Sequence, residues 1–260
     1  MYTTKDHTGK FLTVKTPPQR IISIVPSITE LLADLNLDER VVGITKFCVH
    51  PNHWFTQKPR MGGTKNVNIS KIQQLQPDLI IANKEENVRE QIEELEKISP
   101  VFTTIVDSVA AAVKMIRDVG NLTDKSKKAN EIAQSILASF DNISIQSHKM
   151  ALYLIWKDPY MAAGVDTFIS DMMRYAGYKN VLYNMKRYPV LTEHQIKELK
   201  PEVIFLSSEP YPFKEKHIQE LSTICPDATI KLVDGEMFSW YGSRMVYSSQ
   251  YFKSINKDLN

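Results

Sequence analysis

An internal repeat constrains the fold of this 260-residue chain more than any other feature. The stretch QLQPDLIIANKEE at residues 74–86 matches ELKPEVIFLSSEP at residues 198–210, with Pro77 aligned to Pro201. An earlier stretch, SITELLADLNLDERVVG, has the apolar layout of TFISDMMRYAGYKNVLY in the second half. Solenoid repeats are only about 20–50 residues long, whereas Pro77 and Pro201 lie 124 positions apart. The repeat therefore predicts two similar domains.

Within each half, short apolar segments alternate with amphipathic ones. The apolar segments are IISIV, VVGIT, LIIA and VFTTIV in the first half, then MALYLIW, VIFL and IKLV in the second. Strands that are apolar throughout and separated by helices are typical of parallel sheets buried on both faces. Ser27 and Glu30 form a capping-box pattern, which predicts a helix beginning at Ser27. The chain is thus expected to be an α/β protein with mainly parallel sheets.

The middle of the chain, residues 108–147, lacks a strand pattern. Apolar residues there recur three and four positions apart, which is the period of a helix. We therefore predict an N-terminal α/β lobe at 1–122, a long connecting helix at 123–148 and a C-terminal α/β lobe at 149–260. A ligand cleft between the two lobes is expected.

Composition excludes several classes of function. The net charge is +2 and the basic residues are spread along the chain, which argues against a nucleic-acid surface. No apolar run is long enough to span a bilayer. Two cysteines do not imply a disulfide framework. The start, MYTTKDHTGK, lacks the pattern of a secretory signal, so either the protein stays in the cytoplasm or its leader was removed.

Unusual residues follow the predicted strands. The loops are KFCVHPNHW, NKEEN, KDPYMAAG, SSEPYPFKEKH and DGEMFSWYGSR. In parallel α/β sheets, ligands bind beyond the carboxyl ends of the strands, and a mixture of aromatic and charged groups suits a large amphipathic ligand. In the last loop, Trp240 and Tyr241 are predicted to form a pocket wall, with Glu236 and Arg244 at its polar edge.

Several of these residues have a second interpretation. Cys48, His50 and His53 are residue types that ligate metals, but their spacing is not that of a common structural zinc site, and a polar loop with a buried thiol also explains them. Glu85 belongs to a pair of carboxylates that suits acid–base work or simple solvation. Trp156 fits either the core or a pocket. The chain has no G-x-S-x-G elbow and no phosphate-binding glycine motif, so an enzyme is not predicted.

The whole chain resembles a known family. The opening P-x-R-I-I-S with S-I-T-E-L-L, and the L-Q-P-D-L-I unit, are similar to class III substrate-binding proteins of ABC importers. That superfamily has a helical backbone between its lobes and includes binders of cobalamin, ferric siderophores and haem. The resemblance implies a monomeric binding protein for a small metal-containing chelate, delivered to an ABC permease and ATPase. No cofactor is expected beyond the cobalt or iron of such a ligand.

The resemblance also implies site residues. It adds Pro51, Tyr160 and Asp234 to the candidates, and it implies that surface carboxylates on the two lobes, Glu90 and Glu215, meet arginines of the permease. The full set expected to bind ligand is His50, Pro51, Trp54, Glu85, Trp156, Tyr160, Glu209, Tyr211, Asp234, Glu236, Trp240, Tyr241 and Arg244. The family implies a periplasmic or cell-surface location. The alternative is a cytoplasmic metal-binding protein or metal-dependent enzyme on the same fold, with Cys48, His50, His53, Glu85 and Glu209 as ligands.

Overall fold

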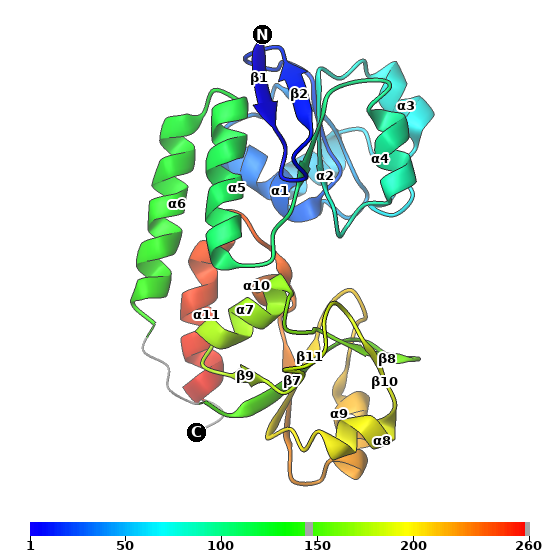
Figure 1. Ribbon diagram of the computed structural model, residues 1–260, viewed down its shortest axis with the longest axis vertical. Coiled ribbons are helices and arrows are strands. Elements are labelled where there is room, and N and C mark those ends of the chain that lie inside the picture. Colours follow the sequence, from blue (N-terminus) through cyan, green and yellow to red (C-terminus); the bar gives the residue numbers. More distant parts are fainter. Residues whose placement is uncertain (144–147, 258–260) are drawn as a thin grey trace. The chain divides into compact units, whose positions relative to one another are not determined.

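The computed structural model describes residues 1–143 and 148–257, which form two compact units (Figure 1). The first unit consists of Met1–Val106, Ala110–Leu137 and Tyr241–Arg244. The second consists of Asp107–Val109, Ala138–Trp240 and Met245–Asn260. Neither unit is one continuous stretch, and the chain returns to the first unit for a short segment late in the sequence.

A four-stranded parallel sheet forms the centre of the first unit. Its strands lie in the order β4 (Val41–Ile44), β3 (Ile21–Ser23), β5 (Leu79–Asn83) and β6 (Val101–Thr104). The intervening helices are α1 (Pro26–Asp34), α2 (Asn52–Gln57), α3 (Ile69–Gln74) and α4 (Arg89–Leu95). An antiparallel hairpin of β1 (Tyr2–Lys5) and β2 (Phe11–Val14) precedes them. Every residue of β5 is buried, which is why residues 79–82 form a continuous apolar run before Asn83.

A mixed sheet forms the centre of the second unit. The order is β10 (Val190–Leu191), β8 (Tyr160–Ala162), β7 (Met150–Trp156), β11 (Val203–Ser207) and β12 (Thr229–Val233), and β9 (Lys179–Asn180) also pairs with β7. The pairs made by β8 are antiparallel, whereas β9, β11 and β12 join in parallel. The helices are α7 (Phe168–Tyr175), α8 (Glu193–Glu198), α9 (Glu215–Ile224), α10 (Glu236–Ser239) and α11 (Met245–Lys257).

The two sheets confirm the duplication predicted from the sequence. The parallel order β4-β3-β5-β6 in the first unit corresponds to β9-β7-β11-β12 in the second. Short helices α3 and α8 end just before the aligned prolines, where Gln76 and Lys200 both take the left-handed conformation, with φ of 44° and 45°. A left-handed residue commonly ends a helix. The same local backbone therefore leads into the central strands β5 and β11.

Two helices occupy the region without strands. They are α5 (Val109–Leu122) and α6 (Ser126–Asp141). The predicted connecting segment 123–148 contains α6, of which the part up to Leu137 belongs to the first unit; residues 144–147 of that segment lie outside the described residues. None of the described helices has the length and apolarity needed to cross a membrane.

The predicted capping box at Ser27 is wrong. Helix α1 begins one residue earlier, at Pro26, and its N-cap Val25 supplies no side-chain bond. Proline fits the first helical position because its fixed φ suits a helix and its missing N–H needs no partner there. Glu30 is thereby free of a capping role, and its carboxylate bonds elsewhere.

Candidate ligand-binding sites

In the first unit, the loops that follow β3, β4 and β5 are bonded to one another. Thr29 at the start of α1 donates to the Sγ of Cys48, which lies in the loop after β4. Asn87, in the loop after β5, donates to the carbonyl oxygens of Ile24 and Thr64. Because carboxyl ends of parallel strands share one edge of the sheet, these loops meet there and are joined by buried polar groups.

An ion pair joins Glu30 to Arg244 close to these loops. The guanidinium donates twice, from Nε to Oε2 at 2.8 Å and from Nη2 to Oε1 at 2.6 Å. The two side chains are only 16% and 14% exposed. Burial raises the pKa of the Glu30 carboxyl, while Arg244 and the nearby His50 oppose the rise. Two donors of the guanidinium are thus occupied by Glu30.

A second side-chain contact in this unit joins Tyr241 to Glu86. Its hydroxyl donates to Oε1 of Glu86 at 2.5 Å, and its side chain is buried, with 6% exposed. Burial and the neighbouring Glu86 hold the pKa of Tyr241 well above its usual range, so the phenol stays a neutral donor. A Cβ on the next residue, Gly242, would lie 3.1 Å from the carbonyl oxygen of Ser27. The segment Tyr241–Arg244 is therefore seated closely on the start of α1.

The candidate metal ligands of the first unit have separate partners. Cys48 is buried, with its Sγ between the hydroxyls of Thr29 and Thr45, and burial raises the pKa of the thiol. His53 bonds to Asp38 at 3.2 Å. Among residues 1–143 and 148–257, no group of three or more His, Cys, Asp or Glu side chains is arranged to hold a metal ion.

Trp54, one of the residues expected to bind ligand, is buried in the core. It is 1% exposed, and its indole N–H donates to Asp38 at 2.7 Å. The ammonium of Lys58 lies 4.6 Å from the ring centre. The neighbouring His50 and Pro51 are half-buried, so the predicted loop contributes those two residues to the surface rather than its tryptophan.

In the second unit, the carboxylate of Glu209 is held by hydrogen bonds at the carboxyl end of the sheet. It follows β11 and accepts from the indole N–H of Trp240 at 2.7 Å and from the hydroxyl of Ser239 at 2.9 Å. Burial raises the pKa of Glu209, and the two hydrogen bonds lower it. Trp240 is 7% exposed. The residue predicted to form a pocket wall is thus largely covered, and its indole N–H holds the Glu209 carboxylate.

The turn after β12 is built closely around Glu209. A Cβ on Gly235 would lie 2.6 Å from Cγ of Glu209 and 2.5 Å from Oγ of Ser207, so no other residue fits there without movement. The N–H of Asp234 donates to the hydroxyl of Tyr251, and Oδ1 of Asp234 accepts from the N–H of Glu236. Both predicted acidic residues are thus half-buried members of one turn.

Aromatic side chains gather at the ends of β7 and β11. Trp156 is 39% exposed and meets Tyr211 edge to face, with ring centres 5.5 Å apart. Tyr211 in turn contacts Phe213 and the buried His217. Tyr160, also expected to bind ligand, is 7% exposed and packs in the core of this unit.

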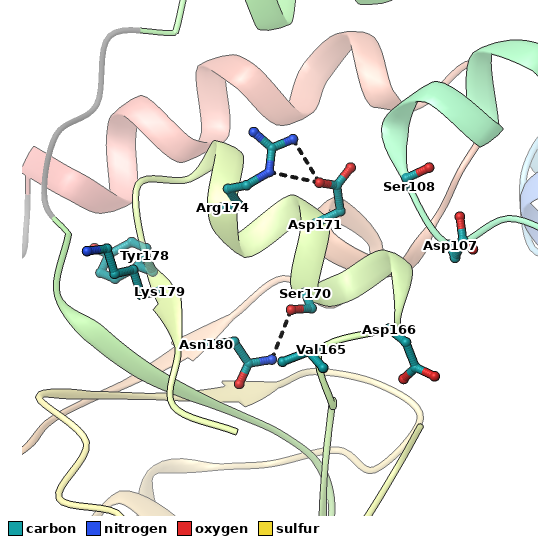
Figure 2. Close-up of a pocket in the computed structure, with 10 residues that line it drawn as sticks. All are labelled: Asp107, Ser108, Val165, Asp166, Ser170, Asp171, Arg174, Tyr178, Lys179 and Asn180. Atoms are coloured by element: carbon teal, nitrogen blue, oxygen red, sulfur yellow. Dashed lines mark hydrogen bonds and ion pairs between the residues drawn. The ribbon is translucent and has the colours of Figure 1, made fainter. Parts of the chain in front are cut away.

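A further hollow in the second unit was not predicted from the sequence. It has a volume of about 540 Å³ and lies beside α7 and β9 (Figure 2). Its polar side chains largely bond one another: Asp171 accepts two bonds from Arg174 and one from the N–H of Val109, and Asn180 donates to Ser170. These residues lie in α7, in β9 and at the start of α5, where no local pattern marks them.

The two predicted docking carboxylates occupy equivalent places. Glu90 lies in the first turn of α4 and Glu215 begins α9, the helices that follow β5 and β11 respectively. Both are exposed. The duplication therefore presents one acidic residue near the start of the corresponding helix in each unit.

Comparison with known proteins was made on both sequence and structure. A family model described as periplasmic binding protein matches residues 21–223. The uncharacterized ABC transporter substrate-binding lipoprotein YvrC of Bacillus subtilis is 27% identical over 78% of this chain and 68% of its own length.

Two solved structures show the same fold. The periplasmic vitamin B12 binding protein BtuF of Vibrio cholerae is 20% identical and covers 93% of this chain and 98% of its own, with a TM-score of 0.78. The periplasmic heme-binding protein BhuT, in complex with two hemes, is 19% identical over 93% and 99% of the two chains, with a TM-score of 0.80. The fold predicted from the sequence is confirmed.

Proposed function

Because the chain belongs to the periplasmic binding protein family, we propose that it is the solute-binding component of an ABC importer and that its solute is a metal-containing chelate. Corrinoids, haem and ferric siderophores are the classes we propose. The protein binds and releases this solute without covalent chemistry. Among its relatives are proteins named for ABC transport, for vitamin B12 and for heme.

One observation carries the proposal: in both units, aromatic and charged side chains gather at the carboxyl ends of the parallel strands. In the first unit these are Glu86 with Tyr241, and in the second Glu209 with Trp240. A pocket for an amphipathic molecule needs apolar walls with a few fixed polar groups. Each pairing fixes a carboxylate against a buried aromatic ring, which supports binding at these edges.

Trp156 supports a planar or aromatic-bearing solute. Its indole is substantially exposed although it lies in a strand whose other residues are mostly buried. The edge of Tyr211 supports the ring from one side. A large exposed ring held in place costs little entropy on binding and stacks well on a conjugated macrocycle.

For the transporter, we propose that Glu90 and Glu215 contact cationic residues of the permease. Their exposure leaves both carboxylates open to a partner. Arginine is the expected partner, since its planar group binds a carboxylate through two parallel bonds.

The test is a thermal-shift panel with cyanocobalamin, hemin and ferric siderophores. A ligand at about 100 times its Kd adds about 2.7 kcal/mol to the stability of the folded state, so the Tm should rise by roughly 5–10 °C. Absorbance and mass spectrometry of protein purified from its native host would identify a co-purified chelate. If every chelate leaves the Tm unchanged and none co-purifies, the proposed solute class is wrong.

A further inference from the structure

One carboxylate oxygen of Glu209 accepts hydrogen bonds from neighbouring side chains, whereas the other accepts none from the described residues. Both side-chain donors, from Ser239 and Trp240, bond to Oε1. Within the described parts of the chain, no group donates to Oε2, and Oε2 is not among the buried polar atoms that lack a partner. Oε2 is therefore an acceptor that has no donor among the described residues and is not fully covered by the protein.

The position of this oxygen is fixed from several sides. The hydroxyl of Ser207 donates to the backbone oxygen of Glu209 at 2.5 Å and accepts from the hydroxyl of Tyr153 at 3.1 Å. Gly235 packs so closely that a Cβ there would overlap Cγ of Glu209. A side chain this constrained loses little rotamer freedom when it meets a ligand. The arrangement is thus a preformed hydrogen-bond acceptor.

The negative charges around Glu209 favour a hydrogen-bond donor, rather than an acceptor, as the ligand group that meets Oε2. The charged neighbours that act on Glu209 are Glu236 and Asp234, and both repel its negative form. A carboxylate of a ligand placed at Oε2 would meet like charges at short range, whereas an amide N–H or a protonated amine would be attracted.

We propose that Oε2 of Glu209 accepts a hydrogen bond from an N–H group of the solute, so that the protein selects amide- or amine-bearing metal chelates over carboxylate-bearing ones. The inference rests on the proposed function and assigns a chemical class to its solute. Trp240 and Ser239 are positioning residues in this scheme, because they bond to Oε1 and orient Oε2 without facing the ligand group themselves.

The decisive variant is Glu209→Gln. Its carbonyl oxygen can still accept from Trp240 and Ser239, while its amide nitrogen takes the place of Oε2. The substitution therefore turns the presented atom from an acceptor into a donor and keeps the local packing. Glu193→Gln is the matched control, since Glu193 is an exposed carboxylate on α8 in the same unit.

Affinities would be measured by titration of tryptophan fluorescence with dicyanocobinamide, which carries peripheral amides, and with hemin, which carries carboxylates. We expect Glu209→Gln to weaken cobinamide binding by about tenfold to a hundredfold, the range for a hydrogen bond to a charged group. Hemin binding should stay equal or tighten, and Glu193→Gln should match the wild type with both probes.

A second comparison needs no variant. A corrinoid whose peripheral amides have been hydrolysed to carboxylates should bind the wild-type protein at least tenfold more weakly than its amide form. Equal affinity for these two corrinoids, or equal cobinamide affinity in wild type and Glu209→Gln, overturns the inference and leaves the proposed function standing. If no chelate of either kind binds the wild type, the proposed function itself has failed.

Discussion

The ion pair between Glu30 and Arg244 should stabilise the first unit strongly, and Arg244→Ala tests this. The pair has two charge-assisted bonds, each of which contributes about 1.5–3 kcal/mol. Removing one partner of a buried pair costs about 3–5 kcal/mol, because the remaining charge stays in a poor solvent. Here the side chains are 14% and 16% exposed, so some water reaches them. We therefore expect Arg244→Ala to lose about 2–4 kcal/mol of stability.

The loss of stability in Arg244→Ala should depend on pH, because the variant keeps the Glu30 carboxyl without its partner. Burial already raises the pKa of Glu30, and Arg244 opposes that rise. Without Arg244 the pKa of Glu30 in the folded state rises further above its unfolded value. A group whose pKa is higher in the folded state than in the unfolded state stabilises the folded state at low pH. This contribution is lost as the pH rises through the pKa of the folded state. The deficit of Arg244→Ala should therefore grow between acidic and neutral pH.

The measurement is urea unfolding followed by circular dichroism at several pH values. Arg89→Ala is the control, because Arg89 pairs with Glu93 in an exposed i,i+4 bridge and should give no measurable loss. Replacing both Glu30 and Arg244 by Leu and Met should recover much of the stability. The reasoning is refuted if Arg244→Ala is no less stable than Arg89→Ala, or if its deficit does not change with pH.

Three further outcomes follow from other contacts. Gly235→Ala should destabilise the second unit by about 1–3 kcal/mol, as in overpacked sites, because its methyl would overlap Glu209; an unchanged urea midpoint would contradict this. Trp156→Ala should weaken chelate binding by about tenfold or more through lost stacking, because its ring is the partly exposed one in this aromatic group, and a binding titration measures the loss. Burial opposes ionisation of Asp118, yet bonds from His7 and Lys114 lower its pKa overall, so the stability it contributes should be lost as pH falls through its folded pKa below about pH 4. An acid titration followed by circular dichroism should show a smaller loss for Asp118→Asn than for the wild type, and parallel curves would count against the role of Asp118.

Much of the fold was predictable because its determinants are local. Strands such as β5 and β11 are buried on both faces, so the four residues before the last one of each strand are apolar without interruption. The repeat around Pro77 and Pro201 was visible because each copy uses the same turn into a central strand. The predicted family is confirmed by the match of residues 21–223.

The candidate sites were predictable only as loops. Trp54 and Tyr160 were expected among the ligand-binding residues on the strength of the family resemblance, and the structure packs both rings inside a core. Loop position does not tell which side of a residue faces the interior, and an aromatic ring gains more from burial than from exposure. The partner of Glu30 was likewise hidden, because its spacing to Ser27 imitates a capping box.

The sequence by itself determined the class of fold, the duplication, the order of the strands along the chain and the loops that carry unusual residues. These properties depend on periodicity and on neighbours a few positions apart. Only the tertiary structure decided the pairings: Arg244 meets Glu30 across 214 positions, and Trp240 meets Glu209 across 31. Such pairings arise when the sheet brings the ends of its strands to one edge, and they convert two aromatic rings and an arginine into supports for carboxylates.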